Sequence, residues 1–368
     1  MQLDTVLKLA SSSKFITTIA VLQAVERGLI ALDDNVAQYI PVLAEQEVLT
    51  GFSWYGKPRT KPRTKKITLR SLLTQTAGAA YDFLAIHPIG RYKWWHKMPI
   101  GQGDYINDRM AYPLVHEPGM GWTYGSGVTW AGKVLEQVSG MTLEEWIQKH
   151  ICEPLGLSSL TFFPGEDLEP RMAEVSYRAW WSGRPIHLPG FRHPESDKEA
   201  MGGESAFASM EDLLAILHSL LVNDEKLLKK ETTSMMFSPQ LDRVQRKDLH
   251  ECLDRPIWIC STILEKGEYD WGLGGVLVDG DSHKCLKRGT LMWSGLFHVL
   301  WVRSICLFAA SSGDGPGPEL TVDKWIDRKS GVCGVFGAQM LPATDKRIIP
   351  LIGDFQREVY RRLNAKDY

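Results

Sequence analysis

The sequence predicts a mixed α/β (α+β) protein, because the spacing of apolar residues changes along the chain. Apolar residues recur every three to four positions from Ser11 to Gly28 and from Val128 to Gly140, which is the period of a helix. After Tyr269 the pattern becomes strand-like, and Ile348 to Leu363 predicts a closing amphipathic helix.

The composition is that of a globular protein with a large core. The chain has 368 residues, of which 44% are apolar, and a formal charge of −2, which argues against general nucleic-acid binding. No apolar run approaches the length of a membrane span, and the N-terminus lacks the layout of a secretory signal. The six cysteines are scattered without a C-x-x-C pair, so a reducing cytoplasm fits best.

A serine and a lysine stand at the head of the first predicted helix. Ser11 and Lys14 are three residues apart and share a helix face, neighbouring serines supply a cap, and Gly28 ends the helix. A serine hydroxyl becomes a nucleophile when a base takes its proton, and a lysine with a lowered pKa can be that base. The tetrapeptide alone is a weak signal, since a capped amphipathic helix with a solvated lysine carries the same pattern.

The stretches around this helix predict shorter elements. Residues before Ser11 predict a strand end, and Leu32–Pro41 predicts a turn and a short helix stopped by Pro41. Lys57–Lys66 holds a tandem Lys-Pro-Arg-Thr and predicts a solvated loop, or alternatively a docking patch for an acidic partner. Ile67–Gly78 predicts a short capped helix and a glycine turn.

Tyr124 lies on a tight loop before the Val128–Gly140 helix, where a phenol can be held rigidly or simply be a buried tyrosine. The aromatic residues of the preceding irregular stretch either line a pocket for an apolar ligand or belong to the core. They are Trp94, Trp95, Tyr105, Tyr112 and Trp122. His116 is interpreted as structural.

The rest of the chain predicts further helices and then strands. These are a helix opened by a capping box at Thr142–Glu145, a helix Met210–Val222 capped by Ser209, a polar helical segment to about Asp254, a strand Tyr269–Val278, a turn Asp279–Ser282 and a strand entered by Arg288–Gly295.

Three motifs in this order resemble those of the serine β-lactamase and penicillin-binding-protein family. Ser11-x-x-Lys14 resembles the first motif and Tyr124-Gly125-Ser126 the second, Tyr-x-Asn/Ser. Trp293-Ser294-Gly295 stands where β-lactamases carry Lys-Thr-Gly. The connecting text agrees, since Leu72–Gly78 resembles Leu-Leu-Thr-His-Thr-Ser-Gly. The resemblance implies a β-lactamase/transpeptidase-like fold, with a central antiparallel sheet flanked by helices and a mostly helical lobe. On this basis we expect a single domain over residues 1–368, with an α/β lobe from about 1–30 and 255–368 and a mostly helical lobe from about 31–254.

The third motif separates the branches of this family. A lysine there would suit the carboxylate of a β-lactam, whereas Trp293 followed by two small residues is similar to the esterase and transesterase branch. The likeness extends to fungal polyketide side-chain acyltransferases of the lovastatin type. It implies transfer of an acyl group from a carrier-protein thioester to the alcohol of a polyketide in secondary metabolism.

The resemblance also implies a role for each residue of the site. Ser11 would be the nucleophile, and Lys14 and Tyr124 would share the work of general base and acid. The backbone N–H groups of Ser11 and Leu296 would form the oxyanion hole, and Trp293-Ser294-Gly295 would contact substrate. No metal or organic cofactor is required. The partners would be a small-molecule acyl donor, an alcohol acceptor and an acidic carrier protein, with neither nucleic acid nor membrane.

Two departures from the family pattern lead to further expectations. Relatives carry several tens of residues before the nucleophile, so an N-terminal helix and strands are expected to be missing here. Val302–Lys324 interrupts an expected strand pair, and removing it would join Trp301 to Trp325. We hypothesise that this segment is an insertion or a retained intron.

Two alternatives remain beside acyl transfer. A carboxylesterase of the same fold differs only in using water as the acceptor. A truncated, inactive or binding-only homologue is the alternative outside enzymes, and the intact set of Ser11, Lys14 and Tyr124 argues against it. A β-lactamase is disfavoured by Trp293.

Overall fold

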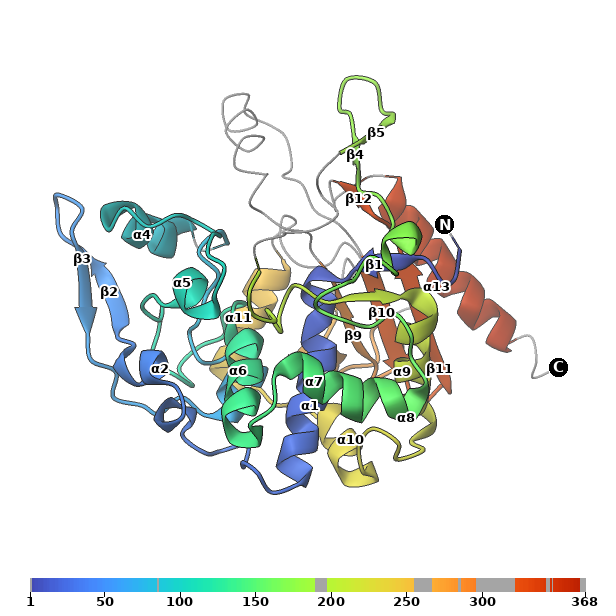
Figure 1. Ribbon diagram of the computed structural model, residues 1–368, viewed down its shortest axis with the longest axis horizontal. Helices are drawn as coiled ribbons and strands as arrows, with labels where there is room; N and C mark the ends of the chain where they lie inside the picture. The colour runs from blue at the N-terminus through green and yellow to red at the C-terminus, as the bar shows by residue number, and fades with distance from the viewer. Residues whose placement is uncertain are drawn as a thin grey trace.

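The computed structural model describes residues 2–84, 86–188, 197–254, 267–283, 286–295, 322–341, 345 and 347–364 (Figure 1). Its largest sheet has five antiparallel strands in the order β11-β10-β9-β8-β7. The strands are β7 (Tyr269–Trp271), β8 (Val276–Val278), β9 (Leu291–Ser294), β10 (Val322–Asp327) and β11 (Val332–Gly337). The predicted α/β class with an antiparallel sheet and helices is therefore confirmed.

Smaller strand groups surround this sheet. They are β1 (Val6–Lys8) with β6 (Phe207–Ser209), the hairpin of β2 (Val48–Phe52) and β3 (Pro58–Lys61), and β12 (Met340–Leu341) with β4 (Ser176–Arg178) and β5 (Pro185–His187).

Many of the remaining described residues belong to helices. The α-helices are α1 (Ser13–Glu26), α2 (Pro41–Glu45), α3 (Leu69–Leu73), α4 (Arg91–Trp95), α5 (Ile106–Met110), α6 (Gly127–Ser139), α7 (Leu143–Ile147), α8 (Glu153–Leu155), α9 (Met210–Val222), α10 (Lys230–Met236), α11 (Arg243–Leu253) and α13 (Ile348–Asn364). Short turns of other helix types are η1 (Ala10–Ser12), η2 (Val36–Gln38), η3 (Ile86–Gly90), η4 (Gln148–Cys152) and η5 (Glu169–Arg171).

Helix α1 runs through the middle of the molecule (Figure 1). It packs against α6 and α7, and its Phe15 and Thr18 side chains lie close to Gly274, in the turn between β7 and β8. Every residue from Ser13 to Ala24 is buried. Neighbours therefore cover this helix on all sides, and the alternative of an amphipathic helix with a solvated lysine is wrong.

The predicted serine cap of α1 was also wrong. Ser12 occupies the N-cap position in a helical conformation and makes no side-chain capping bond. Ser13 instead donates to the Ala10 carbonyl at 2.6 Å and accepts from the Ala206 N–H at 3.0 Å. Tertiary contacts thus take up the hydroxyls that local sequence rules assign to capping.

Three other predicted elements differ from the structure. Pro41 begins α2 rather than ending a helix, since the fixed φ of proline suits a first helical turn. Part of the predicted loop Lys57–Lys66 is strand β3, paired with β2. The single strand predicted for Tyr269–Val278 is the pair β7 and β8, because Gly274 adopts a φ of +104° and turns the chain between them.

Most of the predicted helix boundaries are confirmed. Thr68 and Thr142 form capping boxes at α3 and α7, and the Ser209 side chain caps α9. Gly140 closes α6 in the left-handed conformation. A short local motif was enough to predict these ends.

The proposed division into lobes stays a prediction. Helix α9 falls within the range assigned to the helical lobe, yet it packs against β10 and β11 of the sheet. Of the proposed insertion, 302–321 lies outside the described residues, and Val322–Lys324 forms the start of β10. Within the described part of the chain, no helix combines the length and apolar character needed to cross a bilayer.

Candidate active site

The predicted nucleophile sits on a strained turn that joins β1 to α1. Ala10 has a φ of +46°, a left-handed conformation that costs a non-glycine residue about 1 kcal/mol. The first hydrogen bond of the turn runs from the Ser12 N–H to the Leu9 carbonyl, so the N–H of Ser11 comes before the first bonded amide. Its N–H therefore lies at the positive end of the helix, where a developing oxyanion is stabilised.

The Lys14 side chain connects this serine to two acceptors that the sequence did not reveal. Its Nζ lies 3.2 Å from Ser11 Oγ, 3.0 Å from the Tyr81 hydroxyl and 2.8 Å from the Gly203 carbonyl. The side chain is buried. In the neutral amine, two N–H groups can donate to Tyr81 and Gly203 while the lone pair accepts the Ser11 proton.

Burial lowers the pKa of Lys14 from an ordinary 10.5 to about 7, and the charge of Glu204 opposes this effect. A base with this pKa is substantially neutral at physiological pH, as general-base catalysis requires. Burial also raises the pKa of Tyr81 well above its usual range, with the charge of Glu204 as a further cause. Tyr81 therefore stays a neutral phenol that can accept from Lys14.

Tyr124 lies above Lys14 within a group of aromatic rings. The Lys14 Nζ is 4.7 Å from the centroid of the Tyr124 ring. The Trp293 indole N–H donates to the Tyr124 hydroxyl at 3.3 Å. Trp122 and Trp271 complete the group, with ring centroids 6.4 Å from that of Tyr124. The structure thus brings together the first, second and third predicted motifs.

The third motif ends directly beside the nucleophile turn. Trp293 and Ser294 are buried at the end of β9. A Cβ on Gly295 would stand 2.1 Å from the Leu9 carbonyl oxygen, so only glycine fits at this position. Leu296, the predicted second oxyanion donor, lies outside the described residues.

Residues 201–206 form hydrogen bonds with the other side of α1. Thr17 donates to the Gly202 carbonyl at 2.6 Å, next to the bond from Lys14 to Gly203. Gly203 donates to Thr129 Oγ1 at 3.1 Å, and a Cβ on Gly203 would lie 2.7 Å from that oxygen. The carbonyl that orients Lys14 therefore belongs to a backbone with no room for a side chain.

A buried ionic group holds the same segment. Arg109 of α5 contacts Glu204 at 2.9 Å and Asp197 at 2.5 Å, and all three side chains are largely buried. Burial raises the pKa of Asp197, whereas the charge of Arg109 opposes the effect. The charge that raises the pKa of Lys14 is thus fixed by its own ion pair.

The predicted aromatic stretch does not gather into one pocket. Tyr112 and Trp122 belong to the core, whereas Trp94 and Tyr105 are 74% and 50% exposed and Trp95 is half-buried. Of these five residues, Trp122 is the one in ring contact with Tyr124. The pocket and core alternatives are therefore both incomplete.

Sequence reasoning missed Tyr81, Gly203 and Gln75. Tyr81 follows the Leu72–Gly78 stretch by three residues, and its place beside a family-like stretch is the signal that could have identified it. Gly203 belongs to a double glycine before the Ser209 cap, which the sequence marked only as a turn. Gln75 stands inside the family-like stretch where the family carries histidine.

The sequence pattern described as Beta-lactamase matches residues 1–328. The chain belongs to the β-lactamase family. A solved family structure, simvastatin synthase from Aspergillus terreus in a mutant form, superposes with a TM-score of 0.85 at 31% identity, covering 99% of this chain and 83% of that one. The β-lactamase/transpeptidase-like fold is therefore shared with an enzyme of the acyltransferase branch.

Curated family members similar to this chain are named as acyltransferases and as an esterase. Acyltransferase mokF of Monascus pilosus is 36% identical over 82% of this chain and 74% of its own length. Monacolin J acid methylbutanoyltransferase of Aspergillus terreus is 32% identical over 98% and 83%. Lovastatin esterase of Penicillium rubens is 34% identical over 99% and 87%. The chain is a serine enzyme of this acyltransferase and esterase branch.

Acyl transfer should fail as Lys14 becomes protonated. Because the pKa of Lys14 in the free protein is about 7, kcat/KM should fall as the pH drops below 7. Removing the charge in Glu204→Gln should move this limb to lower pH, since that charge raises the pKa of Lys14. The measurement is kcat/KM from pH 5 to 9 with a small thioester.

Two controls accompany this profile. Glu211→Gln removes an exposed carboxylate and should leave the limb in place. Lys8, whose pKa burial also lowers to about 7, is the rival titrating group, and Lys8→Met should keep the limb. The charge of Glu204 raises the pKa of Lys8 as well, so the Lys8 variant decides between the two lysines. A limb that disappears in Lys8→Met would belong to Lys8 and not to Lys14.

Tyr81→Phe should lower kcat by about tenfold, the equivalent of one net hydrogen bond, because Lys14 loses an acceptor. Tyr112→Phe is the matched control. Tyr112 is equally buried and donates to the Ala80 carbonyl at 2.8 Å without touching Lys14. Equal losses of kcat in the two variants would show that Tyr81 serves only the fold.

Proposed function

We propose that the protein transfers an acyl group from a thioester to the alcohol of a polyketide-type secondary metabolite through an ester on Ser11. The observation that carries this proposal is the buried Lys14 amine, with a pKa of about 7, bonded to Ser11 Oγ. The names of the acyltransferase relatives support the substrate class. The indole of Trp293, in place of a cation, favours acyl groups without a carboxylate.

The first half-reaction makes the acyl-serine. Neutral Lys14 takes the Ser11 proton as Oγ bonds to the thioester carbonyl carbon. The Ser11 N–H stabilises the oxyanion of the tetrahedral intermediate. The carbon–sulfur bond then breaks, and the thiol leaves with a proton from Lys14 or Tyr124. The acyl group remains as an ester of Ser11.

The second half-reaction reverses these roles. The acceptor hydroxyl gives its proton to Lys14 or Tyr124 as its oxygen bonds to the ester carbonyl carbon. The bond to Ser11 Oγ breaks, and Ser11 recovers a proton from the same base. An alcohol acceptor gives transfer, whereas water gives hydrolysis. The similarity to lovastatin esterase supports hydrolysis as a second candidate activity.

Brief incubation with a short acyl thioester should add one acyl mass to the parent protein and none to Ser11→Ala. The intact mass spectrum is the measurement, with peptide mapping to place the adduct. Adding candidate polyketide alcohols or water alone then separates transfer from hydrolysis. A folded parent that stays unlabelled would contradict both activities and favour a binding protein.

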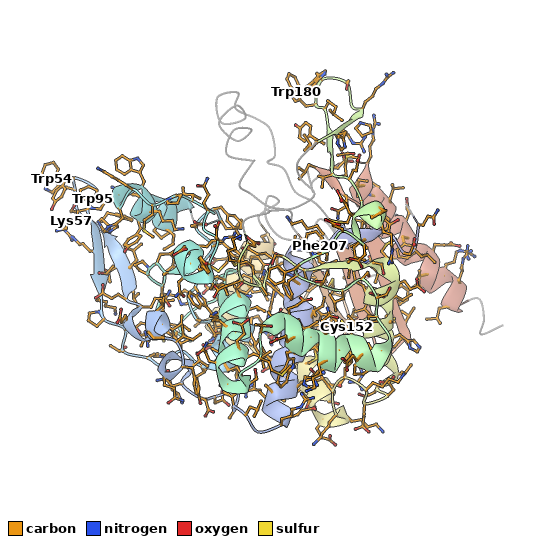
Figure 2. All side chains as sticks on the ribbon, viewed as in Figure 1. Trp54, Lys57, Trp95, Cys152, Trp180 and Phe207 are labelled. Carbon is orange, nitrogen blue, oxygen red and sulfur yellow. The ribbon has the colours of Figure 1, made fainter. Side chains whose placement is uncertain are left out.

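We further propose that the acyl donor is carried by an acidic protein that docks on the β2–β3 hairpin. Figure 2 shows Trp54 and Lys57 at the outer end of this hairpin, near Trp95 of α4. The Trp54 ring is 94% exposed and contacts Tyr55, which in turn contacts Trp95. Exposed tryptophan and tyrosine beside cations are typical of energetically dominant interface residues.

The tandem repeat divides into a bonded half and a projecting half. Arg63 donates to carbonyls at the end of α2, and Lys61 pairs with Glu117 at 3.2 Å. By contrast, the exposed side chains of Lys57 and Arg59 make no ion pair or hydrogen bond with any described residue. The cations available to an acidic partner are therefore those of the first copy.

Replacing Lys57 and Arg59 together by alanine should lower kcat/KM for a carrier-bound acyl thioester about tenfold at low salt, because electrostatic steering is lost. Turnover of the acyl-pantetheine thioester should stay unchanged. Lys229 and Lys230, exposed at the start of α10, give the matched double-alanine control. An equal loss of kcat/KM with the carrier-bound and the pantetheine thioester would contradict the docking surface and leave the proposal of acyl transfer unaffected.

A further inference from the structure

The loop that carries Tyr124 is held at both of its neighbouring amides by one residue, Gln75. The Thr123 N–H donates to the Gln75 backbone carbonyl at 2.9 Å. The Gly125 N–H donates to the Gln75 side-chain oxygen, also at 2.9 Å. Tyr124 stands between these two bonds, so its backbone is fixed from either side.

Gln75 destabilises the fold at its position in two ways. It follows the C-cap of α3 and has a φ of +62°, a conformation in which glycine is favoured. Its side chain is 2% exposed, and the amide Nε2 has no hydrogen-bond partner among the residues that the structure describes. A buried orphan donor and a left-handed backbone both destabilise the fold. The bond to Gly125 is the compensating feature.

The opposite side of the loop is fixed as tightly. The Ser126 N–H donates to the Ala79 carbonyl at 2.8 Å, and a Cβ on Gly125 would lie 1.8 Å from that same oxygen. The Trp122 N–H donates to Asp248 Oδ2 at 3.0 Å. The backbone at Gly125 therefore has no room to shift toward another acceptor if the Gln75 side chain is lost.

We propose that Gln75 is the positioning residue of Tyr124, holding the phenol over Lys14 through the Thr123 and Gly125 amides. This inference rests on the proposed function, because it assigns Tyr124 a part in acyl transfer. Gln75 itself touches neither Lys14 nor Ser11 in a hydrogen bond. Its influence on the reaction therefore passes through the geometry of Tyr124.

A double-mutant cycle tests the inference. Gln75→Met keeps side-chain length but removes the acceptor, and should lower kcat with a small thioester about 10²-fold, as expected for a misplaced catalytic group, with a smaller change in KM. In a Tyr124→Phe background the same substitution should have little further effect, because the group that it positions is already gone.

Gln46→Met is the matched control. Gln46 is also buried, donates to the Tyr112 carbonyl at 2.6 Å, and has an orphan oxygen. The thermal unfolding midpoint of Gln46→Met should fall by about as much as that of Gln75→Met, while its kcat should equal that of the parent. If Gln75→Met unfolds like Gln46→Met but keeps its kcat, or if its loss adds in full to that of Tyr124→Phe, the inference is overturned.

Hydrogen exchange separates this inference from the proposed function. Gln75→Met should speed amide exchange across Thr123–Ser126 whether or not the parent forms an acyl-serine. If Gln75→Met exchanges faster than the parent, and the parent is never acylated, the loop contact is supported and the proposed reaction is contradicted. Unchanged exchange, with the parent acylated, would contradict the role of Gln75 and leave the reaction standing.

Discussion

The burial of Lys14 is the constraint on which the rest of the site depends. Lowering the pKa of a lysine from 10.5 to about 7 corresponds to about 5 kcal/mol against the charged form. The amine can be excluded from water because α1 is covered on all sides by α6, α7 and neighbouring chain. A helix buried in this way is normally apolar. Here its polar side chains each need a fixed acceptor.

Residues 201–206 supply two of those acceptors and one donor. Thr17 and Lys14 bond to successive carbonyls, and Ser13 accepts the Ala206 amide. The segment is in turn tied to α5 through Arg109, a buried ion pair whose value for stability is small once desolvation is counted. Its use lies in position, because it fixes the carbonyl beside Lys14 and the carboxylate whose charge raises the pKa of Lys14.

The sequence predicted which residues would lie together where the signal is local, and it missed contacts that form only when the chain folds. Ser11 and Lys14 share one helix turn, and Tyr124 precedes a clear helix start, so spacing and family pattern sufficed. Tyr81 and Gly203 reach Lys14 across 67 and 189 residues of chain. No local rule predicts such contacts, and the same reason explains why the serine cap of α1 failed.

Trp293 shows how one residue of the third motif changes the chemistry of the others. A lysine there would add a positive charge close to Lys14 and Tyr124, lowering the pKa of Lys14 further and attracting a substrate carboxylate. The indole leaves burial and Glu204 to set that pKa. It also donates to the Tyr124 oxygen, so the phenol must direct its own proton elsewhere. Trp293 thereby leaves out a carboxylate-binding charge and bonds to Tyr124, whose ring lies over Lys14.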